Sequence, residues 1–129
     1  MISAFHHVLY EGIPDRFPRL RFGFIEAAAG WVPYILTELR RRLVRDGRKP
    51  LSDNPLRDNR MYVACQTNDD LKYVIQFARE DNLVIGSDYG HSDTASELEA
   101  LKTLQKTGPL SPEATRKMLE DNPKALYGL

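Results

Sequence analysis

Chemically active side chains follow each of three short apolar runs in the sequence. Glu26 comes after the first run, Gln66 and Thr67 come after the second, and Asp88 and His91 come after the third. A carboxylate and an imidazole suit a divalent metal site, in which an aspartate can also accept a proton from metal-bound water. The carboxyl ends of parallel strands meet at one edge of a sheet, where the active sites of α/β folds form. If the three runs are parallel strands, these side chains are therefore expected to converge.

Each of these candidates also has a structural interpretation. We interpret Asp88 as functional, because the next helix begins several residues later, near Thr94, and direct capping by Asp88 is then unnatural. His91 either orients a substrate or lies in solvent, and both interpretations stay open. Glu26 is a metal ligand, an acid or base, or a residue that orients one of these. Asp93 is interpreted as a turn residue.

Other polar residues receive structural interpretations only. Asn68, Asp69 and Asp70 start a helix and are predicted to cap it, since acids in a first turn complement the helix dipole. His6 and His7 point about 100° apart on a helix and cannot chelate one ion together, so they are interpreted as surface and packing residues. Cys65 lies inside a predicted strand and is expected to be a buried small hydrophobe.

The hydrophobic pattern predicts helices and strands in alternation. Apolar residues at helical spacing indicate helices over residues 2–9, 32–43 and 71–78, and short apolar runs indicate strands over residues 20–26, 61–66 and 83–86. The sequence between the second helix and the second strand, residues 46–60, is predicted to be a polar linker. Strands that alternate with helices in this way are typical of parallel βαβ units with right-handed crossovers.

Further helices are predicted after the third strand. Thr94 and Glu97 have the spacing of a capping box, and Ser111 with Pro112 has the form of a helix start. Asn122 and Pro123 are predicted to begin a final turn that anchors Leu126 and Leu129. Earlier in the chain, the predicted helix over residues 32–43 ends in a basic run, for which a solvated helix end is favoured over an anion site. The basic run consists of Arg40, Arg41, Arg42 and Arg45.

Length and composition exclude several classes of protein. The 129 residues make about one domain, and 18 Lys plus Arg balance 18 Asp plus Glu. The resulting zero formal charge argues against a nucleic-acid partner, which needs a basic excess on one face. The longest apolar stretch, residues 22–36, is interrupted by Glu26 and Pro33 and is too short to span a bilayer. A single cysteine and the lack of a secretory signal predict a soluble, cytoplasmic protein without an internal disulfide.

Three segments resemble a known family. Residues 17–34 resemble the sixth-strand region of amidohydrolase-related metal-dependent hydrolases, in the branch of the amidohydrolase superfamily that includes relatives of aminocarboxymuconate-semialdehyde decarboxylase. Residues 81–93 resemble the eighth-strand motif of that family, and residues 121–129 resemble its usual C-terminus. The resemblance implies an α/β fold class, a partial (β/α)8 TIM barrel. In it, residues 1–129 would be the C-terminal part, with about three parallel strands, barrel strands six to eight, and flanking helices.

The resemblance also implies roles for individual residues. The eighth-strand aspartate of the family ligates a divalent metal, zinc or manganese, and takes a proton from the attacking water or substrate, which assigns both roles to Asp88. Decarboxylase-type members have a histidine at the end of strand six, where this sequence has Glu26, so we expect hydrolysis. Gly90 stands where proline is common, and His91 is retained. The histidines of strands one and five lie in segments that this chain lacks, so we expect the chain alone to bind no metal.

The expected function is therefore metal-activated attack of water on a small-molecule substrate when the barrel is complete. One alternative is a catalytically inert interaction or structural protein that keeps the partial scaffold, and another is a decarboxylase (carboxy-lyase) of the same family. Open edges at barrel strands six and eight favour self-association or pairing with a missing N-terminal half. Neither a nucleic acid nor a membrane is expected as a partner.

Overall fold

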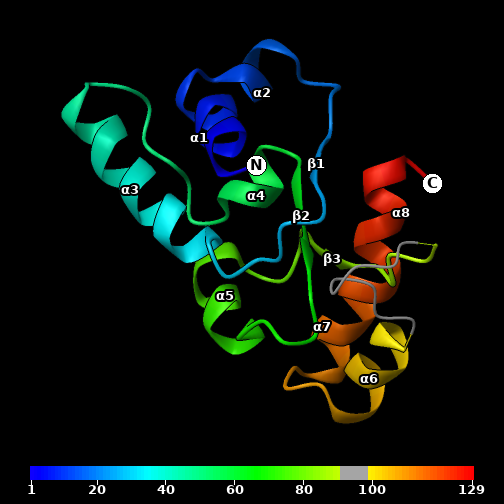
Figure 1. Cartoon of the computed structure of the whole chain (residues 1–129). Helices are drawn as coiled ribbons and strands as arrows, with labels where there is room; N and C mark the ends of the chain where they lie inside the picture. The colour runs from blue at the N-terminus through cyan, green and yellow to red at the C-terminus, as the bar shows by residue number, and fades with distance from the viewer. Residues whose placement is uncertain (91–98) are drawn as a thin grey trace.

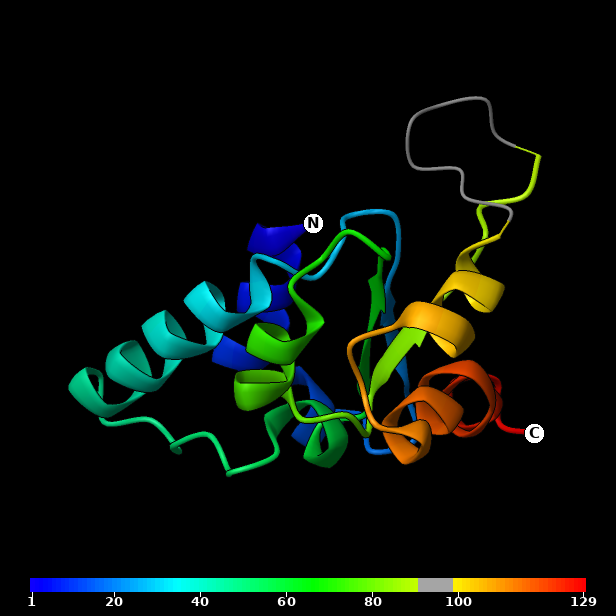
Figure 2. The same cartoon turned by 90° about the horizontal axis from the view of Figure 1, so that it is seen from below.

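The computed structural model describes residues 1–90 and 99–129, in which helices surround a small central sheet (Figures 1 and 2). The strands are β1 (Phe22–Phe24), β2 (Met61–Cys65) and β3 (Leu83–Ile85). The α-helices are α1 (Ile2–Tyr10), α2 (Ile13–Arg16), α3 (Val32–Arg45), α4 (Pro55–Asp58), α5 (Leu71–Ala78), α6 (Ala100–Thr107), α7 (Pro112–Arg116) and α8 (Asn122–Tyr127), and a π-helix, η1 (Lys117–Asp121), joins α7 to α8.

The three strands are parallel and lie in the order β1-β2-β3 in one open sheet. Phe24 pairs with Val63, which in turn pairs with Leu83. Helices α3 and α4 lie in the connection between β1 and β2, and α5 lies in the connection between β2 and β3. The predicted succession of parallel βαβ units is therefore confirmed.

Alternation along the strands divides the sheet into two faces. Phe24, Val63 and Leu83 point to one face and belong to the hydrophobic core, which the helices complete. The helical members of this core that are at most 1% exposed are Phe5, Val32, Leu36, Leu39, Leu56, Leu71, Val74, Ala78, Ala100 and Met118. They come from α1, α3, α4, α5, α6 and η1, so six helices contribute to this core.

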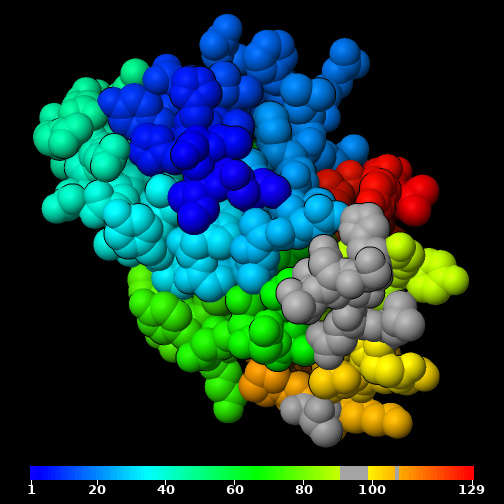
Figure 3. Space-filling model, viewed as in Figure 1, coloured from blue at the N-terminus to red at the C-terminus, as the bar shows by residue number. Residues whose placement is uncertain are grey.

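The opposite face of the sheet carries Gly23, Tyr62 and Val84, which alternate with the core residues. In the described part of the chain, this face contributes no residue to the core cluster. A Cβ added at Gly23 would lie 3.8 Å from Cδ1 of Leu126 in α8. Figure 3 shows the C-terminal residues beside the segment that leads into β1. Helix α8 therefore lies against this second face.

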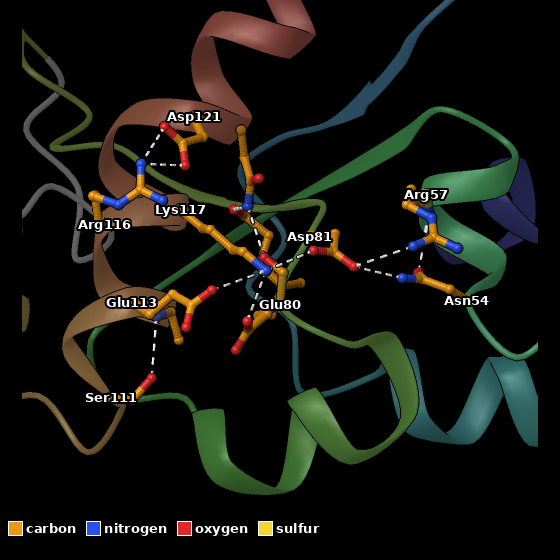
Figure 4. Close-up of polar contacts among 12 residues, drawn as sticks. Asn54, Arg57, Glu80, Asp81, Ser111, Glu113, Arg116, Lys117 and Asp121 are labelled. Carbon is orange, nitrogen blue, oxygen red and sulfur yellow. Dashed lines mark hydrogen bonds and ion pairs between the residues drawn. The ribbon is translucent and has the colours of Figure 1, made fainter.

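The C-terminal helices are fastened to the sheet by buried polar groups. Asn122 is 4% exposed, and its Nδ2 donates hydrogen bonds to the carbonyl oxygens of Glu80 and Leu83 at 2.8 and 2.7 Å. Lys117 Nζ lies 2.8 Å from Glu80 Oε1 and 2.9 Å from Asp81 Oδ1 (Figure 4). The hydrogen bond from Lys117 is the main cause that lowers the pKa of Asp81. These contacts fix the start of β3, and with it the direction in which the strand leads to Asp88.

Helix α3 has the predicted form. Pro33 stands in its first turn, and Leu36, Leu39 and Leu43 are buried along one side. The arginines on the other side all have partners: Arg40 donates to the carbonyl oxygens of Leu51 and Ser52, Arg41 and Arg42 pair with Glu38, and Arg45 pairs with Asp46. The basic run is thus a helix end with paired side chains, in agreement with the structural interpretation.

Several predicted boundaries need correction. The strand predicted over residues 20–26 is only three residues long, because β1 pairs with no more than the first three residues of β2. Residues 46–60 contain the short helix α4, which Asn54 caps by accepting a hydrogen bond from the backbone nitrogen of Arg57. The side chain of Leu129, predicted to be anchored by the final turn, is 91% exposed. The predicted capping box at Thr94 and Glu97 lies outside the described residues, and α6 begins at Ala100.

Across residues 1–90 and 99–129, every helix is too short or too polar to cross a bilayer.

Candidate active site

The carboxyl ends of the three strands meet around one small pocket. Glu26, Gln66 and Asp88 border it, and each lies just beyond a different strand. Its remaining lining residues are Ile25, Ala28, Ala64, Cys65 and Gly86. Its volume is about 80 Å³, which is room for a few water molecules. The structure thus brings together the strand-end side chains of all three runs, and their catalytic roles stay predictions.

Three of the five non-glycine residues with positive φ in the described ranges lie at this edge of the sheet. Glu26 (φ 65°), Ala28 (φ 51°) and Asp88 (φ 51°) all adopt the left-handed conformation. A Cβ atom crowds the backbone in that region, so residues other than glycine rarely occupy it. Strained residues of this kind persist where their surroundings fix them, and they cluster at active sites and ligand clamps. The strain therefore supports this edge as the candidate active site.

Asp69 links the segments that follow β1 and β2. Its Oδ2 accepts hydrogen bonds from the backbone nitrogens of Ala29 and Gln66, both at 2.9 Å. Its Oδ1 accepts another from the nitrogen of Gly30 at 3.1 Å. One carboxylate thus holds backbone groups from two loops, both of which contribute residues to the pocket wall.

The prediction that Asn68, Asp69 and Asp70 cap a helix is correct only for Asp70. Asp70 Oδ1 accepts the hydrogen bond from the backbone nitrogen of Tyr73 at 3.0 Å, which makes Asp70 the N-cap of α5. Asp69 is not a cap, because its carboxylate is turned toward the loop after β1, about 40 positions earlier in the chain. A sequence signal did exist: two adjacent acids precede one helix start, which needs a single capping side chain.

Trp31 holds the loop after β1 from its other side. Its Nε1 donates to the carbonyl oxygens of Ala27 and Ala28, both at 3.0 Å. Its ring meets the buried ring of Phe5 edge-on, with 5.0 Å between the centroids. The strained residue Ala28 is therefore attached to the hydrophobic core through Trp31.

Cys65 is buried, as predicted, with 3% of its surface exposed. Burial, and secondarily the nearby Asp69 carboxylate, raises the pKa of the Cys65 thiol far above its ordinary value. Because the thiolate is the reactive form of cysteine, this thiol has low reactivity in the folded chain although it lines the pocket.

The three histidines do not add to the described site. His91, with Asp93, lies outside the described residues. His6 is half-buried and stacks on Tyr10 with 5.4 Å between ring centroids, and its pKa is lowered, chiefly by burial. His7 is exposed. The interpretation of His6 and His7 as packing and surface residues agrees with these positions.

Larger pockets exist away from the strand ends. One of about 470 Å³ lies between α1 and the loop after α3, and one of about 460 Å³ lies around Lys117. Both contain ion pairs, as between Lys49 and Asp15 and between Lys117 and Glu80. Size alone therefore does not identify the site, and the strand-end pocket is the one that gathers the chemically active residues.

The resemblance to metal-dependent hydrolases raises the question of a metal ion. A catalytic zinc site takes three protein ligands. Within the described ranges, 1–90 and 99–129, no three His, Cys, Asp or Glu side chains are placed so that they could hold an ion. The pocket offers the carboxylates of Glu26 and Asp88 and the amide of Gln66. The described residues on their own therefore do not fit a metal ion.

Comparison with solved structures identifies the fold. An amidohydrolase, map2389c, from Mycobacterium avium subsp. paratuberculosis K-10 superposes with a TM-score of 0.79 at 22% identity, over 99% of this chain and 34% of that one. The 5-carboxyvanillate decarboxylase LigW from Sphingomonas paucimobilis superposes with a TM-score of 0.66 at 17% identity, over 98% and 39%. The chain thus spans little more than a third of the length of either structure. The predicted fold class, part of a TIM barrel with three parallel strands, is confirmed.

A comparison with curated proteins found no match. The amidohydrolase family model, Amidohydro_2, matches residues 2–129. Because that match takes in almost the whole sequence, the chain belongs to the amidohydrolase family.

Proposed function

We propose that this chain forms part of a hydrolase active site in which Asp88 accepts a proton from the water that attacks a small-molecule substrate. The observation that carries the proposal is the position of Asp88, just beyond β3 and on a pocket that it shares with Glu26. A general base acts within hydrogen-bond reach of the proton it takes, and a carboxylate at a strand end can meet a water there. The small pocket suits the reacting group, while the rest of the substrate lies outside it.

The proton transfers balance across the two carboxylates. Asp88 takes a proton as the water oxygen bonds to the carbonyl carbon of the substrate. The bond to the leaving group then breaks as that group receives this proton from Asp88, directly or by way of the Glu26 carboxylate, so that both groups end as carboxylates. His91, which lies outside the described residues, is proposed to orient the substrate.

A divalent metal is general in this family, and its use here is part of the proposal. Asp88 can supply one ligand, and the described residues do not supply a full set. The remaining ligands would have to come from chain segments outside those the structure describes. Zinc and manganese are the metals to test.

Decarboxylation is the second candidate reaction, because LigW, a structural relative described above, is a 5-carboxyvanillate decarboxylase. The identity of the residue that follows β1 favours one of the two reactions over the other. The resemblance to decarboxylase-type relatives places a histidine there, and this chain has Glu26. A carboxylate disfavours the approach of a substrate carboxylate, which decarboxylation requires, and so hydrolysis is preferred.

We further propose that residues 1–129 act as the arc of barrel strands six to eight and pair with other strands. In the described sheet, β1 and β3 are the edge strands, although the carbonyl oxygen of Leu83 in β3 is already bonded to the Asn122 amide. Ile25 and Leu20 flank β1 and are 44% and 49% exposed. Pairing with a five-stranded N-terminal arc, or with a second copy, would cover these residues. Native mass spectrometry of the chain, alone and with a co-expressed arc, tests this.

The activity test combines a substrate panel with matched variants. The chain, with and without an arc that supplies strands one to five, is assayed on small esters, amides and aromatic carboxylic acids with zinc or manganese added. Asp88→Asn is expected to lower hydrolysis by about a hundredfold or more, as expected for loss of a general base. Asp70→Asn, which changes a neighbouring capping acid, is expected to leave it within about twofold. Equal activity of Asp88→Asn and the unsubstituted chain would overturn the proposal, and carbon dioxide release without hydrolysis would favour the decarboxylase.

A further inference from the structure

We infer that Asp69 is a positioning residue of the strand-end site: its carboxylate holds the loop after β1 against the end of β2 and thereby places Glu26 on the pocket that Asp88 borders. The inference deepens the proposed function and rests on it for the role of Glu26. Whether Asp69 holds the loop in place can be tested without measuring catalytic activity.

The hydrogen bonds of Asp69 are directed to the two loops and not to its own helix. Both carboxylate oxygens are used, and their three partners are backbone N–H groups of Ala29, Gly30 and Gln66 at 2.9 to 3.1 Å. Hydrogen bonds to an ionised acceptor are shorter and stronger than neutral ones. Capping of α5, the task expected of Asp69, is done by Asp70.

The loop after β1 needs such a support. Glu26 and Ala28 both have positive φ, a conformation that a short free loop would leave. Asp69 binds this loop at Ala29 and Gly30, and Trp31 binds it at Ala27 and Ala28. The two contacts act on successive residues, so the backbone between Glu26 and Trp31 has little freedom to relax.

Asp69 acts from behind the pocket wall. Glu26, Ala28 and Gln66 line the pocket, whereas Asp69 is not among the lining residues. Its contacts run to the backbone of the same two segments that present those side chains. Asp69 therefore acts through Glu26 and Gln66 and does not itself touch a substrate in the pocket.

The protein contains two natural reporters of this arrangement. Trp31 is the only tryptophan and binds the strained loop directly. Cys65 is the only cysteine, lies on the pocket and is 3% exposed, so its thiol reacts only when the wall opens. Neither reporter needs catalytic activity or an identified substrate.

The test compares Asp69→Ala and Asp69→Asn with two controls in the full chain. Asp70→Ala removes the neighbouring acid, and Lys117→Met lowers stability from the opposite end of the sheet. The rate of Cys65 modification by a thiol reagent is measured with Trp31 emission and the free energy of unfolding. Asp69→Ala is expected to speed Cys65 modification about tenfold or more and to shift the Trp31 emission. The rate of Cys65 modification in Asp69→Asn should lie between the rates of Asp69→Ala and of the unsubstituted chain, since the remaining amide oxygen can still accept hydrogen bonds.

The controls separate local positioning from loss of stability. Asp70→Ala is expected to leave Cys65 modification within about twofold. If Lys117→Met, at equal stability, speeds Cys65 modification as much as Asp69→Ala, the effect is global and the inference is overturned. Unchanged Trp31 emission in Asp69→Ala overturns it as well. Asp88→Asn tests the proposed function separately. If the loop opens in Asp69→Ala while Asp88→Asn hydrolyses substrate at the full rate, the positioning role of Asp69 stands and the proposed function is refuted.

Discussion

The side-chain amide of Asn122 lies 2.7 Å from the carbonyl oxygen of Leu83, the first residue of β3. The same amide nitrogen lies 2.8 Å from the carbonyl oxygen of Glu80, so one buried side chain binds the turn before the strand and the strand itself. Asp88 stands at the other end of this strand. The C-terminal helix and the candidate active site are therefore attached to opposite ends of β3.

Removal of the Asn122 amide is expected to destabilise the fold. Asn122→Ala leaves two buried carbonyl oxygens without this donor, and should lower the free energy of unfolding by about 1–3 kcal/mol. Urea titration measures the change. Lys124→Ala, an exposed change in the same helix, should cost less than about 0.5 kcal/mol. A similar loss in both variants would show that the buried amide has no special role.

The Lys117 cluster predicts a second loss of stability. Lys117 reaches Glu80 and Asp81, while Asp81 Oδ2 also accepts a hydrogen bond from Asn54 Nδ2 at 2.6 Å (Figure 4). Lys117→Met keeps the length of the stem and removes the charge. The expected cost is about 1–2 kcal/mol at neutral pH, because the groups are partly exposed and solvent weakens their attraction. Thermal or urea unfolding measures it, and no loss would contradict the contribution of the cluster.

The same cluster predicts a pH dependence with a definite sign. The hydrogen bond from Lys117 lowers the pKa of Asp81 in the folded chain. The unfolded carboxyl titrates near its ordinary value of about 3.9, so this stability is fully present above about pH 5 and is lost as the pH falls through the folded pKa. The stability difference between the unsubstituted chain and Lys117→Met should therefore shrink on acidification. A difference that grows below about pH 4 would contradict this linkage.

Two glycines give a matched pair of predictions. A Cβ added at Gly108 would overlap the backbone carbonyl oxygen of Leu104, whereas one added at Gly23 would make only ordinary contacts, the nearest 3.6 Å from Ile25 Cδ1. Gly108→Ala is expected to cost about 1–3 kcal/mol, the usual range for overpacking. Gly23→Ala is expected to be close to neutral. If urea unfolding gives the same loss of free energy of unfolding for both variants, the neighbours of Gly108 can move aside at no cost, which would contradict the prediction.

Local patterns were sufficient for most of the architecture. The apolar stripe of α3, with Leu36 and Leu39 inside, and the run of β2 follow from spacing alone, because each pattern is repeated within a few residues. The parallel arrangement followed from the alternation of such segments. The meeting of Glu26 with Asp88 at one edge followed from that arrangement in turn.

The contacts that hold the site together could not be predicted from local sequence patterns. Asp69 and Asn122 each bond to backbone groups about 40 positions away, and a backbone group carries no side-chain identity that a sequence could reveal. The residue types of Glu26 and Asp88 likewise give no sign of their positive φ, since glycine is the residue usually found in left-handed backbone. These features arise from tertiary packing, which overrides local preference.

A double-substitution cycle on Glu26 and Asp88 tests the central claim most directly, using hydrolysis by the chain paired with strands one to five. Glu26→Gln and Asp88→Asn are each expected to lower kcat/KM by about 10²–10⁴. Because both carboxylates serve one reaction at one pocket, the double variant should lose little beyond the larger single loss. Losses that multiply, or a fully active Asp88→Asn chain, would contradict a shared site at the strand ends.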